Sequence, residues 1–345
     1  MQLSYDVLSV HTKHPFIIAR GGTSTWSVVW VRLRDHDGVE GWGEAAPSRF
    51  YGETTDTVVA ALQRFAPLIE GADAWSIEAI EREISQSLRW NAAAKVAISA
   101  ALHDLQGKRL GVPLWKLWGL SPAKAPQSSF TIGIAPDDET LRARVREASA
   151  YPVLKVKLGS ARDRDTLRIV REEAPHAVIR VDANAAWTPK STLAMLDTLV
   201  EFGVEMLEQP LPPHDLDGLK FVRERCPMPL FADESCLVAS DIPKLAGCVD
   251  GINLKLMKCG SLREAHRMIA TARAHDLQVM CGCMIETTLG IASAAHFASL
   301  LDYVDLDGAA LLADDPFVGP TITAPGALGT ISLGDAPGLG VEKRA

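Results

Sequence analysis

Acidic side chains recur directly after short apolar runs in the middle of the chain. Asp182 follows VIRV, Glu208 follows VEML and Asp233 follows PLFA, at intervals of 26 and 25 residues. Each interval is about one strand–helix unit, and the carboxyl ends of barrel strands lie together at one face. Three carboxylates without His or Cys suit Mg²⁺, one ion per site, with positions left for water and substrate.

Lysines flank these acids along the chain. Lys155 and Lys157 lie two residues apart in VLKVKL, so both share one face of a strand, and Lys255 follows INL. The strands that carry Lys157 and Lys255 would lie on opposite sides of an eight-stranded ring. Desolvation beside a metal ion lowers a lysine's pKa and makes a general base available. The pattern predicts removal and return of a proton next to a carboxylate, from two faces.

A second acidic pair ends the series. Asp305 and Asp307, in DYVDLDG, share one face of their strand, and two carboxylates together are well placed to receive a cationic group. Ion pairs with the three lysines would explain the acids without a metal. Lysines in a barrel mouth need counter-charge under either interpretation.

The elements that must position these residues alternate as strand and helix from about residue 125. Eight β-like runs, each followed by an amphipathic segment, predict a TIM-type (β/α) barrel over 123–315. The runs are 128–133, 153–157, 178–181, 204–207, 229–232, 251–254, 278–281 and 302–306. A doubly wound α/β sheet is the structural alternative, but it does not account for the charges at the strand ends.

The first 122 residues predict an α+β capping domain. A strand over 27–34 and a turn at 35–38 lead into a second strand that ends near Ala45. Helical patterns follow over 54–69, 76–88 and 91–107, and we expect 316–345 to pack back on this domain. The glycine-rich stretch 38–43 is not a dinucleotide fingerprint, because Pro47 follows where a helix would have to begin.

Composition excludes several classes of partner. The 345 residues carry a net charge of −8 with scattered basic residues, which argues against nucleic acid and anionic membranes. No apolar stretch of about 18 residues and no signal peptide are visible. The six cysteines form no C-x-x-C pair, which favours a reduced, cytoplasmic protein.

Taken together, the motifs of the second half resemble those of the enolase superfamily, in its muconate-lactonizing subgroup. They are K-x-K at 155–157, VDAN at 181–184, EQP at 208–210, ADES at 232–235 and NLKLMKCG at 253–260. The resemblance covers essentially the whole chain. Within the subgroup, Asp305-Leu306-Asp307 is similar to the D-x-D of dipeptide epimerases, above all L-Ala-D/L-Glu epimerase, where it holds the substrate's α-ammonium.

The resemblance implies a reaction and a set of roles. A Mg²⁺-dependent enzyme would invert the α-carbon of a dipeptide's C-terminal residue by two-base proton transfer through an enolate, in peptidoglycan peptide metabolism. Lys157 and Lys255 would be the acid and base, and Lys155 would bind substrate and stabilise the enolate.

Three further residues match positions that contact substrate in this family. Thr131, in SFTIG, and Cys283, in CGCMIET, would line the dipeptide, although both residue types are also ordinary in a core. Arg20, in PFIIARG, matches a loop arginine that meets the glutamyl carboxylate; a solvated loop arginine is the alternative reading.

Several alternatives remain at this stage. N-acylamino acid racemases, o-succinylbenzoate synthases and cycloisomerases use the same lysines and ligands, but their substrates offer no ammonium to Asp305 and Asp307. Acid-sugar dehydratases place a His on the seventh strand, where this chain has none. A Schiff-base aldolase using Lys155 or Lys255 and a catalytically silent binding protein are the alternatives of other classes. The particular dipeptide and a homo-oligomeric state are left open.

Overall fold

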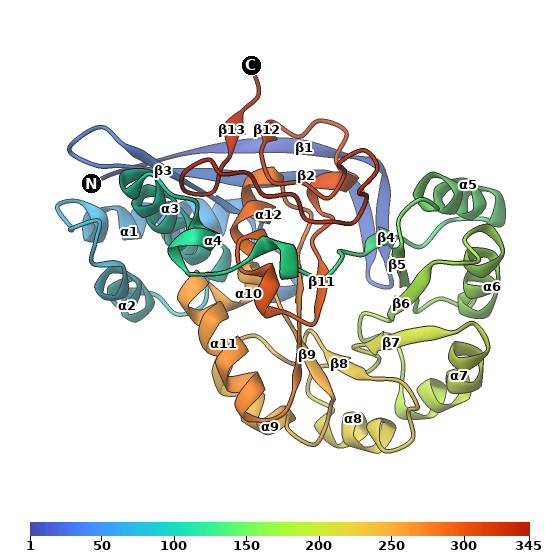
Figure 1. Cartoon of the computed structure of the whole chain (residues 1–345). Helices are drawn as coiled ribbons and strands as arrows, with labels where there is room; N and C mark the ends of the chain where they lie inside the picture. Colours follow the sequence, from blue (N-terminus) through green and yellow to red (C-terminus); the bar gives the residue numbers. More distant parts are fainter.

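The computed structural model describes residues 1–345 and contains a barrel with a cap laid across it (Figure 1). The barrel is an eight-stranded sheet whose neighbouring strands are parallel, and the cap is a three-stranded antiparallel sheet with helices. The predicted TIM-type barrel with an α+β cap is confirmed.

The cap sheet has the order β1-β2-β3, with helices covering one side. Gly41 and Gly43 on β3 allow α3 to approach closely, since a Cβ at either position would collide with the carbonyl oxygens of Ala101 or Ala97. The glycine-rich segment therefore serves sheet–helix packing. The elements are β1 (Gln2–Ile18), β2 (Gly21–Arg34), β3 (Glu40–Ala45), η1 (Arg49–Tyr51), α1 (Thr55–Ile69), α2 (Ile77–Ser87), α3 (Ala92–Leu110), α4 (Leu114–Leu117) and η2 (Pro122–Lys124).

The barrel strands follow one another in chain order around the ring. Where β11 meets β4, Ser129 N donates to Val304 O (3.0 Å), which nearly closes it. The strands are β4 (Phe130–Ile132), β5 (Val153–Lys157), β6 (Val178–Asp182), β7 (Val204–Glu208), β8 (Leu230–Ala232), β9 (Gly251–Leu254), β10 (Gln278–Gly282) and β11 (Tyr303–Asp305).

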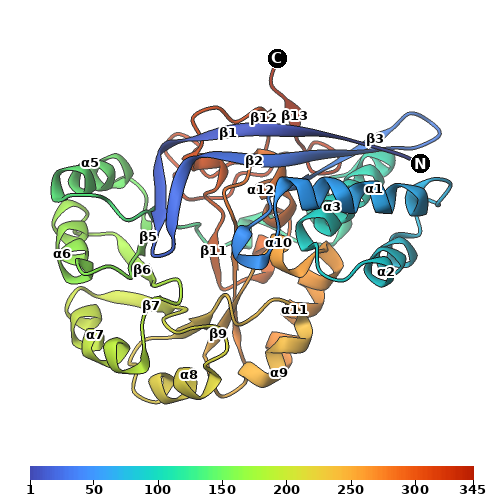
Figure 2. The ribbon, with the colours of Figure 1, turned by 180° about the vertical axis from the view of Figure 1, so that it is seen from behind.

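Helices ring the strands on the outside (Figures 1 and 2). They are α5 (Asp138–Ala148), α6 (Asp163–Glu173), α7 (Pro189–Glu201), α8 (Leu216–Arg223), η3 (Ala239–Asp241), α9 (Ile242–Leu245), α10 (Leu256–Cys259), α11 (Leu262–Ala274), α12 (Thr288–Ala295), η4 (Ala298–Leu300) and η5 (Ala309–Leu311). None of them has an apolar stretch long enough to cross a membrane.

Two segments join the cap to the barrel. The β1–β2 hairpin bends, and its tip descends to the barrel beside β5 and β6 (Figures 1 and 2). The C-terminal segment forms the small pair β12 (Phe317–Val318) and β13 (Glu342–Lys343), and Phe317 packs edge-on against Trp30 of the cap with ring centroids 5.4 Å apart.

Strand register places the polar residues on one rim of the barrel. Lys157 is paired with Asp182, Asp182 with Glu208, and Gly282 with Asp305. Because Lys157, Asp182, Glu208 and Asp305 are the last residues of their strands, their side chains gather at the rim where the hairpin tip arrives.

Candidate active site

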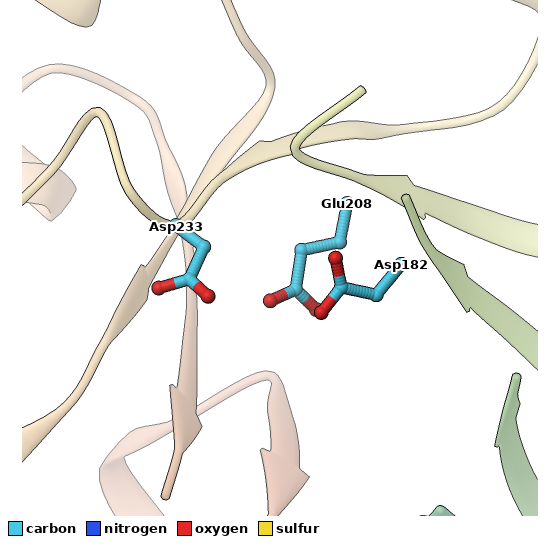
Figure 3. Close-up of side chains that lie close together, drawn as sticks. All are labelled: Asp182, Glu208 and Asp233. Atoms are coloured by element: carbon cyan, nitrogen blue, oxygen red, sulfur yellow. The ribbon is translucent and has the colours of Figure 1, made fainter. Parts of the chain in front are cut away.

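Three carboxylates from consecutive strands converge at this rim. Asp182 ends β6, Glu208 ends β7 and Asp233 directly follows β8, and one oxygen of each lies within 4.8 Å of the others. Figure 3 shows Asp182 and Glu208 side by side, with Asp233 facing them. The structure thus brings together the three residues for which the sequence predicts a metal-binding role.

The chemistry of this group fits a hard divalent cation. The three residues are at most 1% exposed, no His or Cys lies among them, and the buried Glu208 Oε2 makes no hydrogen bond. Burial, reinforced by repulsion from Asp182, raises the pKa of Glu208 to about 7. Clustered buried carboxylates of this kind are costly without positive charge, and oxygen ligands suit Mg²⁺.

Lys155 supplies part of that positive charge from the floor of the site. Its Nζ lies 2.7 Å from Asp305 Oδ2 and 3.6 Å from Asp182 Oδ2. It is also 2.8 Å from Glu208 Oε2, outside hydrogen-bonding geometry. Burial acts to lower the pKa of Lys155, but the three carboxylates outweigh it and hold the pKa well above its usual value. Lys155 is therefore a cation fixed among acids.

Lys157 and Lys255 face the carboxylates from opposite sides. Lys157 ends β5 and donates to Asp182 Oδ2 (2.7 Å), whereas Lys255 follows β9 and donates to Asp233 Oδ2 (2.8 Å). β5 and β9 are four places apart in the ring of eight, which makes them diametrically opposed. Burial alone would lower the pKa of Lys255, as the sequence suggests, but Asp233 outweighs it and the pKa is raised.

The acidic pair at the end of β11 is only partly free to receive a ligand. Asp305 accepts from Lys155 Nζ and from Ser129 Oγ (2.6 Å). Asp307 accepts from the backbone N–H of Thr131 (2.6 Å). Burial and the neighbouring Asp305 raise the pKa of Asp307 to about 7. Asp307 has no ammonium partner within the chain and is the one available to a cationic ligand.

Thr131 and Cys283 both lie beside Asp307. Thr131 is paired with Lys155 across β4 and β5, so its side chain shares the inner face of the barrel. Cys283 Sγ lies 3.9 Å from Asp307 Oδ1, and burial raises the pKa of its thiol well above the usual value. A neutral thiol at this point can line a ligand but does not act as a nucleophile.

Arg20 reaches the rim from the tip of the β1–β2 hairpin. Its Nη1 donates to Asn184 O (2.6 Å) and lies 2.8 Å from Glu234 Oε1. The guanidinium also lies over the Phe50 ring, 4.1 Å from its centroid. Arg20 therefore lies at the rim, paired with an acid through one nitrogen, and its side chain is 33% exposed.

Several residues in contact with the site were missed from the sequence although they lie inside the quoted motifs. They hold the carboxylates: Asn184 donates to Asp182, Asn253 to Glu208 and Lys258 to Asp233. Asn184 was visible only as the last letter of VDAN, and the other two as neighbours of Lys255. Spacing gives no signal for Asn253 and Lys258, because each reaches a carboxylate at the end of another strand, whereas Asn184 lies only two residues after Asp182 and its contact is local.

Comparison with known proteins matches both parts of the chain. Residues 3–119 match the N-terminal domain of mandelate racemase and muconate lactonizing enzymes. Residues 139–345 match the enolase C-terminal domain-like family. The L-Ala-D/L-Glu epimerase of Bacteroides thetaiotaomicron is 38% identical over 99% of this chain and 88% of its own. The chain belongs to the enolase superfamily, among the dipeptide epimerases.

Solved structures agree with this membership. The dipeptide epimerase of Enterococcus faecalis, solved with Mg and L-Leu-L-Tyr, superposes with a TM-score of 0.92 at 32% identity over 99% of both chains. A substrate-liganded L-Ala-D/L-Glu epimerase from Bacillus subtilis gives 0.92 at 30% identity, over 100% of this chain and 99% of that one. One of these relatives is thus seen with a dipeptide of large side chains, and the other is named for L-Ala-D/L-Glu.

Proposed function

We propose that the protein is a Mg²⁺-dependent dipeptide epimerase that inverts the α-carbon of the C-terminal residue by two-base proton transfer. The observation that carries the proposal is the pair Lys157 and Lys255, which lie at the ends of diametrically opposed strands, Lys157 as the last residue of β5 and Lys255 directly after β9. Family membership and the relatives named above support it.

The residues of this chain divide the reaction among them. One of Lys157 and Lys255 takes the α-proton from one face, and the other returns a proton to the opposite face. Lys155, a buried cation, stabilises the negative charge that develops on the substrate's carboxylate as the proton leaves. Asp307, with Asp305 beside it, receives the α-ammonium at the other end of the dipeptide.

Asp182, Glu208 and Asp233 are the residues that would hold the metal ion. When bound there, Mg²⁺ would supply positive charge that stabilises the charge developing on the substrate's carboxylate and offsets the acidic groups beside the lysines. The triad has the oxygen donors and the burial for this.

Deuterium exchange from each epimer in D₂O tests the two-base assignment. With L-Ala-L-Glu and L-Ala-D-Glu as probes, the wild type should exchange both α-protons, and EDTA should stop exchange until Mg²⁺ is restored. Lys157→Ala should slow the exchange of one epimer, and Lys255→Ala that of the other. Each rate should fall by about 10²–10⁴-fold. If both variants exchange both epimers at the wild-type rate, the two-base assignment is wrong.

The side chain on the inverted carbon is the finer part of the proposal. Arg20 uses Nη1 for Asn184 and Glu234, and its remaining donors are available for a carboxylate. We propose that they meet the side chain of a C-terminal Glu, which favours L-Ala-L-Glu. The peptidoglycan context and the cytoplasmic location that the sequence suggests belong to the same proposal.

Substitution of Arg20 tests this preference. Arg20→Met should lower kcat/KM for L-Ala-L-Glu by about tenfold or more, a loss typical of a charge-assisted hydrogen bond. The value for L-Ala-L-Leu should change little. Equal losses for both dipeptides would mean that Arg20 supports the structure of the rim and does not select the side chain of the substrate.

A further inference from the structure

Asp233 lies between two lysines that differ in their surroundings. Lys258 Nζ donates to Asp233 Oδ1 (2.6 Å), to Asp233 O (2.6 Å) and to the backbone carbonyl of Asn253 (2.8 Å). An ammonium has three N–H groups, so all of its donors are used inside the protein. The side chain of Lys258 is 0% exposed. Lys258 is therefore immobile and has no donor left for a substrate.

Lys255, three residues earlier, contrasts with it. It donates to a single carboxylate oxygen, Asp233 Oδ2, and its side chain is 9% exposed. The other oxygen of Asp233 is fixed by Lys258. The two oxygens of the Asp233 carboxylate are thus held by two different lysines.

The same corner of the chain also orients a second carboxylate. Asn253, on β9, donates through Nδ2 to Glu208 Oε1 (2.7 Å), and the other oxygen of Glu208 accepts no hydrogen bond. The side-chain amide of Asn253 packs against Gly282 of β10, where the absence of a Cβ leaves room for it. A Cβ at Gly282 would lie 2.9 Å from both its Nδ2 and its Oδ1.

We propose that the corner formed by β9 and α10 is a positioning frame for the metal site, in which Lys258 orients Asp233 and Asn253 orients Glu208. The inference rests on the proposed Mg²⁺ site, but it assigns these two residues a role distinct from the proton transfer of Lys255. Asp182 lies outside the frame, because Asn184, from its own loop, donates to it through the backbone (2.8 Å) and the side chain (3.1 Å).

Lys258 and Asn253 are positioning residues in this arrangement, so their loss should appear first in metal affinity. Substitutions of groups that orient metal ligands typically weaken binding by about 10–100-fold. At saturating Mg²⁺ the oriented carboxylates are recovered, so kcat should return close to the wild-type value while the Mg²⁺ concentration needed for half-maximal activity rises.

Direct titration with Mn²⁺, followed by electron paramagnetic resonance without any dipeptide, tests the frame. Lys258→Gln and Asn253→Ser should each raise the Kd for Mn²⁺ by about 10–100-fold. Lys244→Gln, on the exposed face of α9, is the matched control and should bind as the wild type does. Wild-type affinity in both frame variants would overturn the proposal.

A second comparison guards against loss of folding. Asn253→Ser keeps the backbone carbonyl that accepts from Lys258, so it removes only the contact with Glu208. Its melting temperature in EDTA should stay near that of the wild type while the Kd rises; a fall in stability with unchanged affinity would assign a structural role and overturn the proposal. Because Mn²⁺ binding is read without substrate, weakened binding in the variants supports the frame even if no dipeptide is epimerised.

Discussion

Two regions of this molecule that hold buried carboxyl groups neutralise them differently. At the barrel rim, Lys155, Lys157, Lys255 and Lys258 all lie within hydrogen-bonding distance of acids. At the junction of cap and barrel, Glu44 and Glu286 are buried with no ammonium or guanidinium bonded to either.

The junction pair links β3 to the loop that follows β10. Glu44 accepts from Thr287 through its backbone N–H (2.9 Å) and its hydroxyl, and Glu286 accepts from Met284 N (2.8 Å). A Cβ at Gly290 would lie 2.7 Å from an oxygen of each glutamate, so the two carboxyl groups are close.

At this junction the carboxyl groups have no lysine partners, and their raised pKa values favour the neutral, protonated form instead. Burial raises the pKa of Glu44 to about 8, offset in part by Thr287 and reinforced by Glu286 and Asp315. Burial likewise raises the pKa of Glu286 to about 7, with Lys255 acting in the opposite direction. Glu286 also contributes to raising the pKa values of two thiols in the neighbouring β10 segment, Cys281 and Cys283.

The contrast indicates what each region requires. Fixed ammonium groups hold the pKa values of Asp182, Asp233 and Asp305 below the ordinary value although burial acts to raise them. Glu208 and Asp307, whose pKa values burial raises to about 7, are the exceptions at the rim. At the junction a carboxyl group only has to form hydrogen bonds and packing contacts. In its neutral form it does so without the free-energy cost of burying a charge.

The strongest test of the contrast removes a lysine from the rim. Lys155→Met should leave Asp305, Glu208 and Asp182 without their shared cation, and removing one partner of a buried ion pair costs about 3–5 kcal/mol. Urea unfolding in EDTA at pH 8, compared with the wild type, measures this. Epimerisation should also be lost. Unchanged stability would mean that the rim carboxylates become protonated, as the carboxyl groups at the junction do. The two regions would then not differ in how they neutralise buried acids.

The next largest effect concerns the acids at the end of β11. The double substitution Asp305→Asn with Asp307→Asn removes the charges that we propose receive the substrate's ammonium. KM for L-Ala-L-Glu should rise by about tenfold or more. The KM of N-acetyl-L-Ala-L-Glu, which lacks the ammonium, is the control and should rise much less. Equal changes for the two substrates would remove the ammonium role.

The smallest effect is the pH dependence of the junction. Glu44 has a pKa of about 8 in the folded protein against an ordinary value of 4.5, so its neutral form stabilises the fold. That contribution is fully present below about pH 4.5 and is lost as the pH rises through about 8, by at most about 1.4 kcal/mol per pH unit. Glu44→Gln should flatten this decline in urea unfolding measured from pH 5 to pH 9.

An exposed carboxyl group gives the control for this measurement. Glu70→Gln, at the exposed end of α1, should keep the wild-type slope. If Glu44→Gln also keeps that slope, the junction does not hold a proton, and the two regions do not differ in the way described.

Sequence patterns predicted the barrel well because its strands are buried and end in charged residues. Each predicted strand lies within two residues of an observed one, from β4 to β11. The strand β1 was missed, since most of its residues are exposed and Pro15 interrupts its alternation. An exposed edge strand has little apolar periodicity to detect.

The site was predictable in its parts but not in its contacts. Lys157, Lys255 and the triad follow from strand ends, which local sequence reveals. The bond between Asn253 and Glu208 joins residues 45 positions apart, and the Glu44–Thr287 contact joins residues 243 apart. Such pairs depend on how strands and domains are arranged, and a single sequence carries no local signal for them.

The position of the residues along the chain has a consequence for how such an enzyme diversifies. The lysines and the acidic triad all lie between residues 155 and 258, whereas Arg20, Thr131, Cys283 and the Asp305–Asp307 pair lie outside that stretch. Under the proposed function, the residues of proton transfer and metal binding and most residues that contact the dipeptide are therefore encoded in separate segments. Exchange of the flanking segments between homologues should yield new substrate preferences while the proton-transfer machinery is inherited intact.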